Sequence, residues 1–468
     1  MRASAVRAAV PPAVAIVLAL LPAPAGLTDA AWRFFALFAG TVTALVLEPL
    51  PATAVGVISV SLAAALRLVD PSPAGSARWA LSGFGNTTVW LIFSAFVLAL
   101  GYEKSGLGRR LALLMVRAIG RRPLGLGYAI ALSDLVLAPL TPSNTARSAG
   151  TLFPVIRQIP AQCAPAPGEA HRRLGAFLAW TAFAVTCVTS SMFLTALAPN
   201  LLAVEVVRST VGVRLEWTSW VAGFWPVGLA LVALTPLASY VVFRPGAGPE
   251  SAGASAWAAG QLRAMGRFTG REATMAALAL LALAGWIAGR ELLDATTVAL
   301  LVVGLMVLTG VVGWDDVLGH RVAWNVLVWF ATLVALADGL ARVGFVSWVA
   351  KNATALLAGF PPLGAALLLL AVFFAVHYLF ASITAHVAAV LPVVLATAAA
   401  IPGIEMARFA ALLCYSLGLM GVISPYATGP APVYYGSGFL SRREFWGLGF
   451  AFGVVFLLAL LGLAVLVL

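Results

Sequence analysis

A short polar motif occurs twice in an otherwise apolar sequence. Residues 142–147 read Pro-Ser-Asn-Thr-Ala-Arg, and residues 381–386 read Ala-Ser-Ile-Thr-Ala-His. Each copy contains Ser-x-Thr-Ala followed by a cationic or titratable residue. Hydroxyl groups and free backbone amides inside a bilayer need a protein partner, because lipid offers none. A paired, repeat-related polar break of this kind predicts the binding site of a secondary transporter.

The hydroxyl and amide groups of the motifs are hydrogen-bond donors that suit carboxylates. We expect Ser143, Asn144 and Thr145 to bind one carboxylate. Ser382 and Thr384 would bind a second. Two donor clusters therefore predict a substrate with two acidic ends. The alternative is that these side chains only satisfy backbone groups at a helix break or hold helices together. The repetition of the motif favours binding.

Two ionisable residues occupy equivalent places in the two motifs. Arg147 and His386 each lie two residues after the motif threonine. Ionisable groups at membrane depth are functional candidates, and we expect these two to balance the charge of the substrate. The alternative for Arg147 is an ion pair with Asp134. Moving unpaired fixed charge through a low-dielectric barrier is costly, so a carrier with such cations would move readily only when loaded. This reasoning predicts obligatory exchange.

The composition places the chain in a membrane. Of its 468 residues, 62% are hydrophobic and 10% are charged, and the mean hydropathy is +1.02, a balance that soluble domains do not have. The three cysteines are scattered and predict neither a disulfide framework nor a metal site. The net charge of +11 is explained by basic cytoplasmic loops without a nucleic-acid partner.

Apolar runs long enough to cross a bilayer predict the architecture, an all-α polytopic membrane protein. Two longer stretches, 124–158 and 362–400, are each interrupted by a motif and are interpreted as re-entrant hairpins. We expect eleven spans besides these hairpins, at 8–25, 31–48, 52–68, 86–103, 174–198, 217–243, 273–290, 295–313, 322–340, 405–427 and 445–468.

The distribution of basic residues predicts the sidedness. With the N-terminus inside, 18 of the 28 lysines and arginines fall in cytoplasmic segments and 9, among them Arg290, fall outside, while Arg147 lies in a motif. The first hairpin would then enter from the cytoplasm and the second from the outside. Residues 1–27 resemble a signal peptide, but a retained first helix fits the topology better than a cleaved one.

Two segments between the spans have distinct compositions. Residues 106–122 mix leucines with arginines and predict an amphipathic helix on the inner membrane surface. Residues 244–271 are rich in glycine, alanine and serine and are interpreted as a flexible linker between the halves.

An internal repeat relates these halves. The motif serines are 239 residues apart, a Thr-to-Pro segment recurs at an offset of 233, and a helix-end glycine recurs at 238. An odd number of predicted crossings separates equivalent elements, so the repeat is inverted. The Thr-to-Pro segments predict broken helices, which free backbone groups in the membrane. They add Thr195, Thr428 and Pro430 to the candidate substrate-binding residues.

Several stretches together carry a family resemblance, and they are 83–93, 101–110, 137–147, 192–195, 380–386 and 425–438. The chain resembles the divalent anion:sodium symporter family, and more narrowly its branch of citrate/succinate and 2-oxoglutarate/malate exchangers. The resemblance implies a homodimer in a bacterial inner membrane, with scaffold helices and a mobile transport domain that works by an elevator motion.

The same resemblance divides the chain and bears on cofactors. It implies a scaffold with an interfacial helix at 1–122, transport units at 123–210 and 361–440, scaffold helices and the linker at 211–360, and a terminal helix at 441–468. No cofactor is implied, although Na+ sites flank the family's two Ser-Asn-Thr motifs. Here Ile383 replaces the second asparagine and removes a donor, whereas a Na+ ion near Ser143 and Asn144 stays open.

The function that we expect is the exchange of di- and tricarboxylate anions such as malate, succinate, 2-oxoglutarate or citrate. The main alternative is a Na+-coupled symporter of dicarboxylates or sulfate. A membrane enzyme is disfavoured, because the sequence shows no nucleophile–base or metal constellation. An anion channel fits the basic motif but does not account for the inverted repeat.

Overall fold

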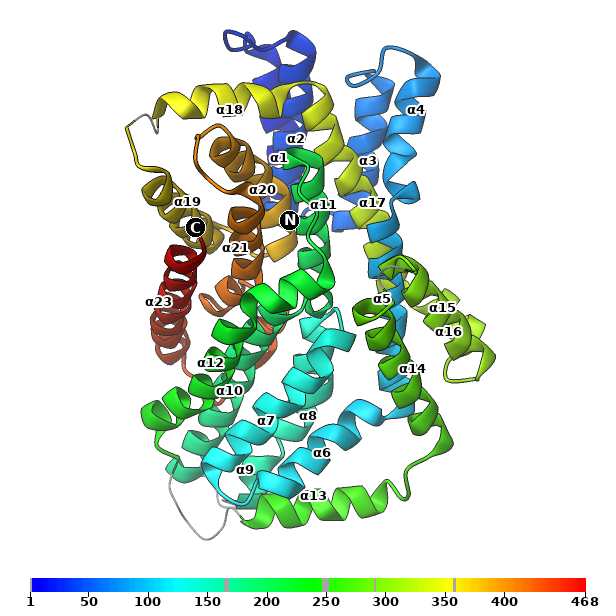
Figure 1. The fold of residues 1–468 in the computed structure, drawn as a ribbon, viewed down its shortest axis with the longest axis vertical. Helices are drawn as coiled ribbons and strands as arrows, with labels where there is room; N and C mark the ends of the chain where they lie inside the picture. The colour runs from blue at the N-terminus through cyan, green and yellow to red at the C-terminus, as the bar shows by residue number, and fades with distance from the viewer. Residues whose placement is uncertain (1, 164–167, 246–251, 290–291, 357–358) are drawn as a thin grey trace.

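The computed structural model describes residues 2–163, 168–245, 252–289, 292–356 and 359–468, and within them all regular secondary structure is helical (Figure 1). Each of the eleven predicted spans overlaps a helix. These helices are α1 (Arg2–Leu20), α2 (Asp29–Leu47), α3 (Ala52–Ala65), α5 (Thr87–Ser105), α10 (Glu169–Met192), α12 (Trp217–Phe243), α14 (Gly270–Ile287), α15 (Ala295–Leu308), α17 (Arg321–Arg342), α21 (Met406–Leu419) and α23 (Arg442–Val467).

Eight helices of the described residues are long and apolar enough to cross a membrane. A ninth span results if α5 is joined to α4 (Pro73–Leu81) and η1 (Ser82–Gly85), which meet it at a bend of 41°. Five further apolar helices are shorter, and α1, α3, α15 and α21 are among them. Their length alone does not show that they cross, so the number of eleven spans stays a prediction.

Both predicted hairpins are interrupted at their polar motifs. The first consists of α7 (Pro123–Leu137), η2 (Ala138–Leu140), the π-helical segment η3 (Thr145–Leu152), α8 (Phe153–Ile156) and α9 (Ile159–Cys163). The second consists of α19 (Pro362–Val376), η6 (His377–Leu379) and α20 (Ile383–Ala399). Proline at the start of α7 and α19 suits the first turn, where its missing N–H leaves no bond unmade.

The two segments expected to be broken helices are broken. Helix α10 ends at Met192, and η4 (Leu194–Ala196) leads into α11 (Ala198–Val211). Helix α21 continues as η7 (Met420–Val422), and irregular backbone then runs to α22 (Ala431–Tyr435). The backbone therefore leaves the helical path beside each hairpin, as the repeat predicted.

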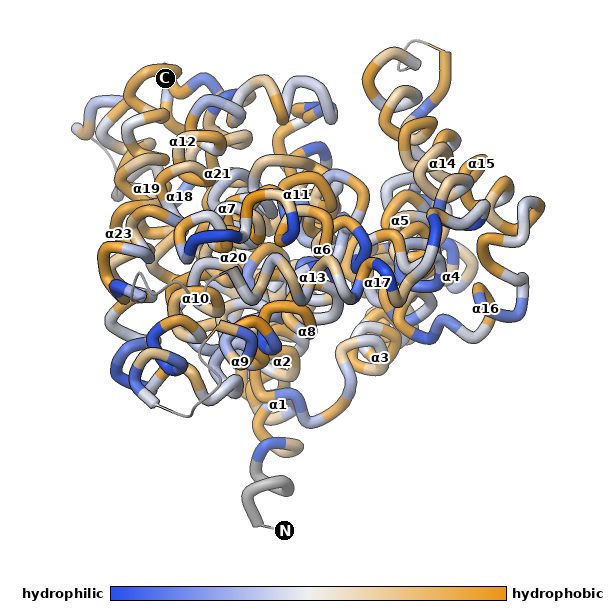
Figure 2. Tube along the Cα trace, turned by 90° about the horizontal axis from the view of Figure 1, so that it is seen from below, coloured by the Kyte–Doolittle hydropathy of each residue, from blue (hydrophilic) through white to orange (hydrophobic). Residues whose placement is uncertain are grey.

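The core is centred on α10, whose apolar window is entirely buried. It packs against α7, α12 and α21, and Trp180 makes edge-to-face contacts with Phe445 and Phe452 of α23. Hydrophobic residues also lie on the outside of the molecule, and Figure 2 shows them along α14, α15 and α23. Leu280, Leu308 and Leu458 are exposed there, as expected where lipid replaces water.

A second, smaller core joins α2, α3, α4 and α17 to α18 (Phe345–Leu356). Phe34 packs edge-to-face on Trp79, and Phe35 stacks on Phe345 with ring centroids 4.3 Å apart. Aromatic pairs in these geometries add to the energy of apolar burial. The N-terminal helices are thereby fixed to α17, which continues from α16 (Trp314–Gly319).

The segment interpreted as a flexible linker is helical over much of its length. Residues 106–122 form the expected helix, α6 (Leu107–Ile119), and α13 (Ala252–Ala264) packs against it. The linker interpretation is wrong for these residues of α13, because alanine is the best helix former and offers a flat face for packing. Linker residues 246–251, like Arg290, lie outside the described part of the chain.

Candidate functional site

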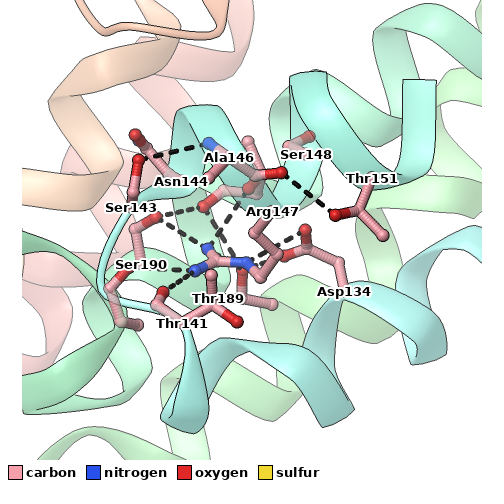
Figure 3. Close-up of polar contacts among 12 residues, drawn as sticks. Asp134, Thr141, Ser143, Asn144, Ala146, Arg147, Ser148, Thr151, Thr189 and Ser190 are labelled. Carbon is pink, nitrogen blue, oxygen red and sulfur yellow. Dashed lines mark hydrogen bonds and ion pairs between the residues drawn. The ribbon is translucent and has the colours of Figure 1, made fainter. Parts of the chain in front are cut away.

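The first motif lies where the hairpin backbone turns from η2 into η3. Ser143 Oγ accepts a hydrogen bond from the backbone amide of Ala146 at 3.1 Å and so satisfies one free N–H at the start of the helix (Figure 3). Thr145 and Ala146 are exposed. A Cβ atom at Gly429 would lie 2.0 Å from Thr145 Oγ1, so only glycine allows this approach. The first motif therefore touches the second broken helix.

A direct hydrogen bond confirms that the two halves meet at this point. The buried Asn144 side chain donates from Nδ2 to Thr428 Oγ1 at 2.9 Å. Six residues beyond Thr428, the Tyr434 hydroxyl bonds to that of Ser148 at 2.8 Å. The structure thus brings together Asn144 and Thr145 of the first half and Thr428 of the second, and Asn144 and Thr428 are 284 residues apart in the chain. Pro430 lies close by in the chain and is buried at the start of α22.

Arg147 is almost completely buried, with 1% of its surface exposed. Its Nε lies 3.2 Å from an oxygen of Asp134, which is also fully buried and accepts a hydrogen bond from Thr189 (Figure 3). The rest of the guanidinium donates to neutral groups of the hairpin, α10 and η4. These acceptors are the carbonyls of Thr141 and Ala196 at 2.9 Å and the hydroxyls of Ser190 at 3.1 Å and of Thr186 and Thr189 at 3.3 Å.

The ion pair expected as the alternative for Arg147 is therefore present. Asp134 neutralises the formal charge of Arg147, and the hydrogen bonds tie three chain segments together. A role for Arg147 in balancing substrate charge stays a prediction. Any such role has to take into account that Asp134 already offsets the charge of Arg147.

The second motif begins helix α20. Ser382 Oγ accepts a long hydrogen bond of 3.4 Å from the amide of Ala385, the counterpart of the Ser143 bond in the first motif. Ser382 and Thr384 are half-buried and line a cavity of about 490 Å³. Ile383, which replaces asparagine, is 4% exposed and belongs to the apolar core. Its side chain supplies no polar group to the cavity.

His386 is fully buried in an aromatic enclosure. Its ring centroid lies 4.4 Å from that of Phe373 and 5.1 Å from those of Phe380 and His377. Neither of its ring nitrogens has a hydrogen-bond partner among the described residues. His377 differs, because its Nε2 lies 2.8 Å from the carbonyl oxygen of Ala427 in the second broken segment. Charge balance by His386 remains a prediction.

The two motifs line two neighbouring cavities. The cavity at Ser143 and Arg147 has a volume of about 260 Å³ and is closed on its other side by α5, α6 and the start of α17. The cavity at Ser382 is closed by the α2–α3 turn and by Trp329 of α17. Val322 of the first cavity and Trp329 of the second are seven residues apart, which is about 10 Å along a helix.

Thr195 lies away from both motif cavities. It is buried, donates to the carbonyl of Pro139 at 2.5 Å and accepts from Trp217 Nε1 at 3.1 Å. It lines a third cavity of about 250 Å³ together with Asp294 and other residues of α5, α12 and α15. The structure therefore places Thr195 beside η2, the turn that precedes the first motif.

His320, at the α16–α17 junction, also lines the first cavity. Burial lowers the pKa of His320 below its usual value, and the nearby charge of Glu103 opposes that shift. Its ring is therefore held toward the neutral form beside the cavity.

Residues 2–467 match the family of the sodium:sulfate symporter transmembrane region. The chain belongs to this family. It is 44% identical over 458 residues to the citrate/succinate antiporter of Escherichia coli, covering 95% of this chain and 94% of that one. It is 42% identical over 465 residues to the L-tartrate/succinate antiporter of the same species, with coverage of 96% and 95%. This family member is a multi-pass membrane protein.

Two solved transporter structures share the fold of this symporter-family chain. The YdaH transporter of Alcanivorax borkumensis has a TM-score of 0.53 and 18% identity over 85% of this chain and 88% of its own. MtrF of Neisseria gonorrhoeae has a TM-score of 0.54 and 15% identity over 92% and 97%. At these identities the comparison supports the fold alone.

Several residues of the site were not among the candidates chosen from the sequence of this family member. Tyr434, Thr189 and Ser190 enter through hydrogen bonds to the first hairpin and its arginine. Glu48, at the C-terminal end of α2, lines the second cavity. Asp134 was named from the sequence only as a partner of Arg147, because it is a carboxylate within an apolar run, thirteen residues before the arginine.

Proposed function

We propose that this chain is a secondary active transporter that exchanges di- and tricarboxylate anions across a membrane. The relatives that share 44% and 42% of their residues with it are named antiporters of citrate, tartrate and succinate. The observation that carries the proposal is the pair of serine-capped motifs, each of which lines its own cavity.

The chemistry of the motifs suits carboxylates. Helix starts present free N–H groups and the positive end of the helix dipole, and anions bind there. The hydroxyls of Ser143, Thr145, Ser382 and Thr384 add neutral donors at the same places. A substrate with two acidic ends would use both motifs, one end at each, once the two cavities join around it.

Exchange is favoured over Na+ symport by the second motif. The apolar side chain of Ile383 is buried in the core and provides no oxygen ligand for a cation. In the proposed mechanism Arg147 and His386 contribute to the balance of substrate charge, with Asp134 setting how much of the arginine charge is available. The intact first motif keeps Na+-coupled transport of a dicarboxylate or sulfate as the second candidate.

The proposed motion is an elevator movement of the two transport units against the scaffold, within a homodimer whose N-termini face the cytoplasm of a bacterium. Support comes from the walls of the cavities. Each motif cavity has residues of 1–122 and 211–360 on one side and residues of one transport unit on the other. A sliding boundary between scaffold and transport units would pass through both cavities.

The experiment that separates the two candidates uses purified protein in proteoliposomes. Labelled succinate is offered to vesicles that contain unlabelled succinate or no anion, each in Na+ and in K+ buffer. Uptake only into loaded vesicles, equal in the two buffers, is expected for the exchanger. Uptake into empty vesicles that requires a Na+ gradient would replace exchange by symport, and the absence of uptake in every condition would refute dicarboxylate transport.

A further inference from the structure

Helices α6 and α13 pack against each other at the lower end of the molecule in Figure 1, where α13 lies across the direction of α5 and α10. Ser255 of α13 donates to the backbone carbonyl of Arg117 in α6 at 2.9 Å. Arg109 of α6 donates to Gln261 of α13 at 3.0 Å. Burial of the inner face of α13 completes the contact, through Ala254, Ala258 and Leu262.

This surface is strongly and uniformly basic. Residues 106–122 and 252–271 contain eight arginines and no aspartate or glutamate. The next carboxylate, Glu272, is bound to Arg110 at 2.5 Å, and Arg110 also donates to the carbonyl of Gly266 at 3.0 Å. Arg110 therefore holds the turn between α13 and α14, and its charge is paired with that of Glu272.

Four other arginines of this surface, which we call the arginine shelf, are exposed. In the part of the chain that the structure describes, their side chains have no hydrogen-bond or ion-pair partner. The arginine shelf consists of Arg117, Arg122, Arg263 and Arg267.

Some arginines on the opposite, predicted outer side are paired within their own helix. The positive-inside rule explains on which side of a membrane arginines accumulate, but it does not explain whether they are paired. Three of the outer arginines have a carboxylate three or four residues away on their own helix. These pairs are Arg208 with Glu205 at 2.6 Å, Arg342 with Asp338 at 2.7 Å and Arg408 with Glu405 at 3.2 Å. The arginine shelf thus offers charge that the protein itself leaves unneutralised.

Exposed apolar side chains lie next to the shelf. Leu114 and Ile119 of α6 are 42% and 39% exposed, and Phe268 after α13 is 54% exposed. The Arg110 guanidinium lies 5.9 Å from the centre of the Phe268 ring. Helices that lie in a membrane interface combine apolar side chains that enter the acyl boundary with basic ones that stay among the headgroups.

We propose that the arginine shelf binds the phosphate headgroups of anionic phospholipids in the leaflet that it faces. The planar guanidinium forms paired hydrogen bonds with phosphate oxygens. Each basic residue at an anionic membrane surface strengthens binding by about fivefold. The proposal concerns binding of lipid and does not depend on the transported substrate.

The test uses the full-length protein purified in a neutral detergent. Retention of phosphatidylglycerol and of phosphatidylcholine is measured by native mass spectrometry, and the thermal midpoint is followed as each lipid is added. The variant is Arg117→Gln/Arg263→Gln. The matched control, Arg33→Gln/Arg214→Gln, removes two exposed arginines of the predicted outer side that likewise have no described partner. A charge-preserving variant, Arg117→Lys/Arg263→Lys, guards against a folding defect.

Wild type is expected to retain phosphatidylglycerol over phosphatidylcholine and to be stabilised by it. The glutamine variant should bind it at least about tenfold more weakly, while the lysine variant and the control retain binding. Added NaCl should weaken the effect through screening. The proposal would be overturned by equal retention of the two lipids or by unchanged binding in the glutamine variant. It would also be overturned if inorganic phosphate or heparin stabilised the protein as much as phosphatidylglycerol does, because that result would indicate a soluble anion as the ligand.

Discussion

The buried pair of Asp134 and Arg147 makes a sharp prediction about stability. Arg147 contacts six acceptors, and Asp134 is the single one among them that carries a negative charge. The substitution Asp134→Ala leaves the guanidinium buried among neutral hydroxyls and carbonyls. Removal of one partner from a buried ion pair costs about 3–5 kcal/mol, because the remaining charge is uncompensated.

Replacement of both partners is expected to behave differently. The double variant Asp134→Leu/Arg147→Met removes both charges and keeps similar side-chain volumes, so its stability should lie within about 1–2 kcal/mol of wild type. Because the carbonyls of Thr141 and Ala196 lose their donor in this variant, some of the loss will persist. Substrate exchange should still fall, since the hairpin and η4 are no longer tied together.

The assay is unfolding of the purified protein in mixed micelles with increasing denaturing detergent, followed by tryptophan fluorescence. It compares wild type, Asp134→Ala, the single variants Asp134→Leu and Arg147→Met, and the double variant. The buried pair predicts a coupling energy well above 1 kcal/mol, with the double variant more stable than Asp134→Ala. If Asp134→Ala unfolds like wild type, or if the double variant is no more stable than the single one, the interpretation of Arg147 as a neutralised structural cation is wrong.

Three further substitutions test the rest of the site. In Asn144→Ala, unlabelled substrate should compete with labelled substrate for uptake about two- to tenfold more weakly than in wild type. Thr428→Val in the same protein should weaken the competition little further, because both substitutions remove the same hydrogen bond. Additive effects of the two substitutions would contradict the hydrogen bond between Asn144 and Thr428. Gly429→Ala places a methyl group 2.0 Å from a neighbouring hydroxyl and should abolish uptake, whereas Gly447→Ala, which meets nothing within 4 Å, should behave as wild type; normal uptake by the first would refute the close approach. Burial lowers the pKa of His320, so its neutral form contributes stability above about pH 6.5 that is lost as the pH falls through the lowered pKa. Between pH 7 and 5 the thermal midpoint should therefore fall less in His320→Gln than in wild type. Equal falls in the two proteins would exclude a contribution of His320 to the pH dependence of stability.

The positions of the breaks could be predicted from sequence, because polar groups and prolines stand out against an apolar background. Hydropathy placed each predicted span on a helix, and the motifs at 142–147 and 381–386 fall where the hairpins are interrupted. The serine caps follow from the same local chemistry. Local patterns of this kind act over a few residues, which one sequence displays directly.

Contacts between distant segments could not be predicted. The bond from Asn144 to Thr428 joins residues far apart in the chain, and the repeat does not indicate which broken helix each motif contacts. Thr195 faces a third cavity because Pro139 and Trp217 engage its hydroxyl. Helix α13 was missed because its alanine-rich composition also suits a linker, and its packing on α6 decides between the two.

The central claim is that the two motifs together form the substrate site of an exchanger. The most direct test is the concentration of succinate that half-saturates uptake into succinate-loaded vesicles, in wild type, Ser143→Ala, Ser382→Ala and the control Thr309→Ala at an exposed helix end. Loss of a hydrogen bond to a carboxylate should raise this concentration at least about tenfold in each motif variant and leave the control unchanged. Wild-type values in either motif variant, with exchange intact, would contradict the claim.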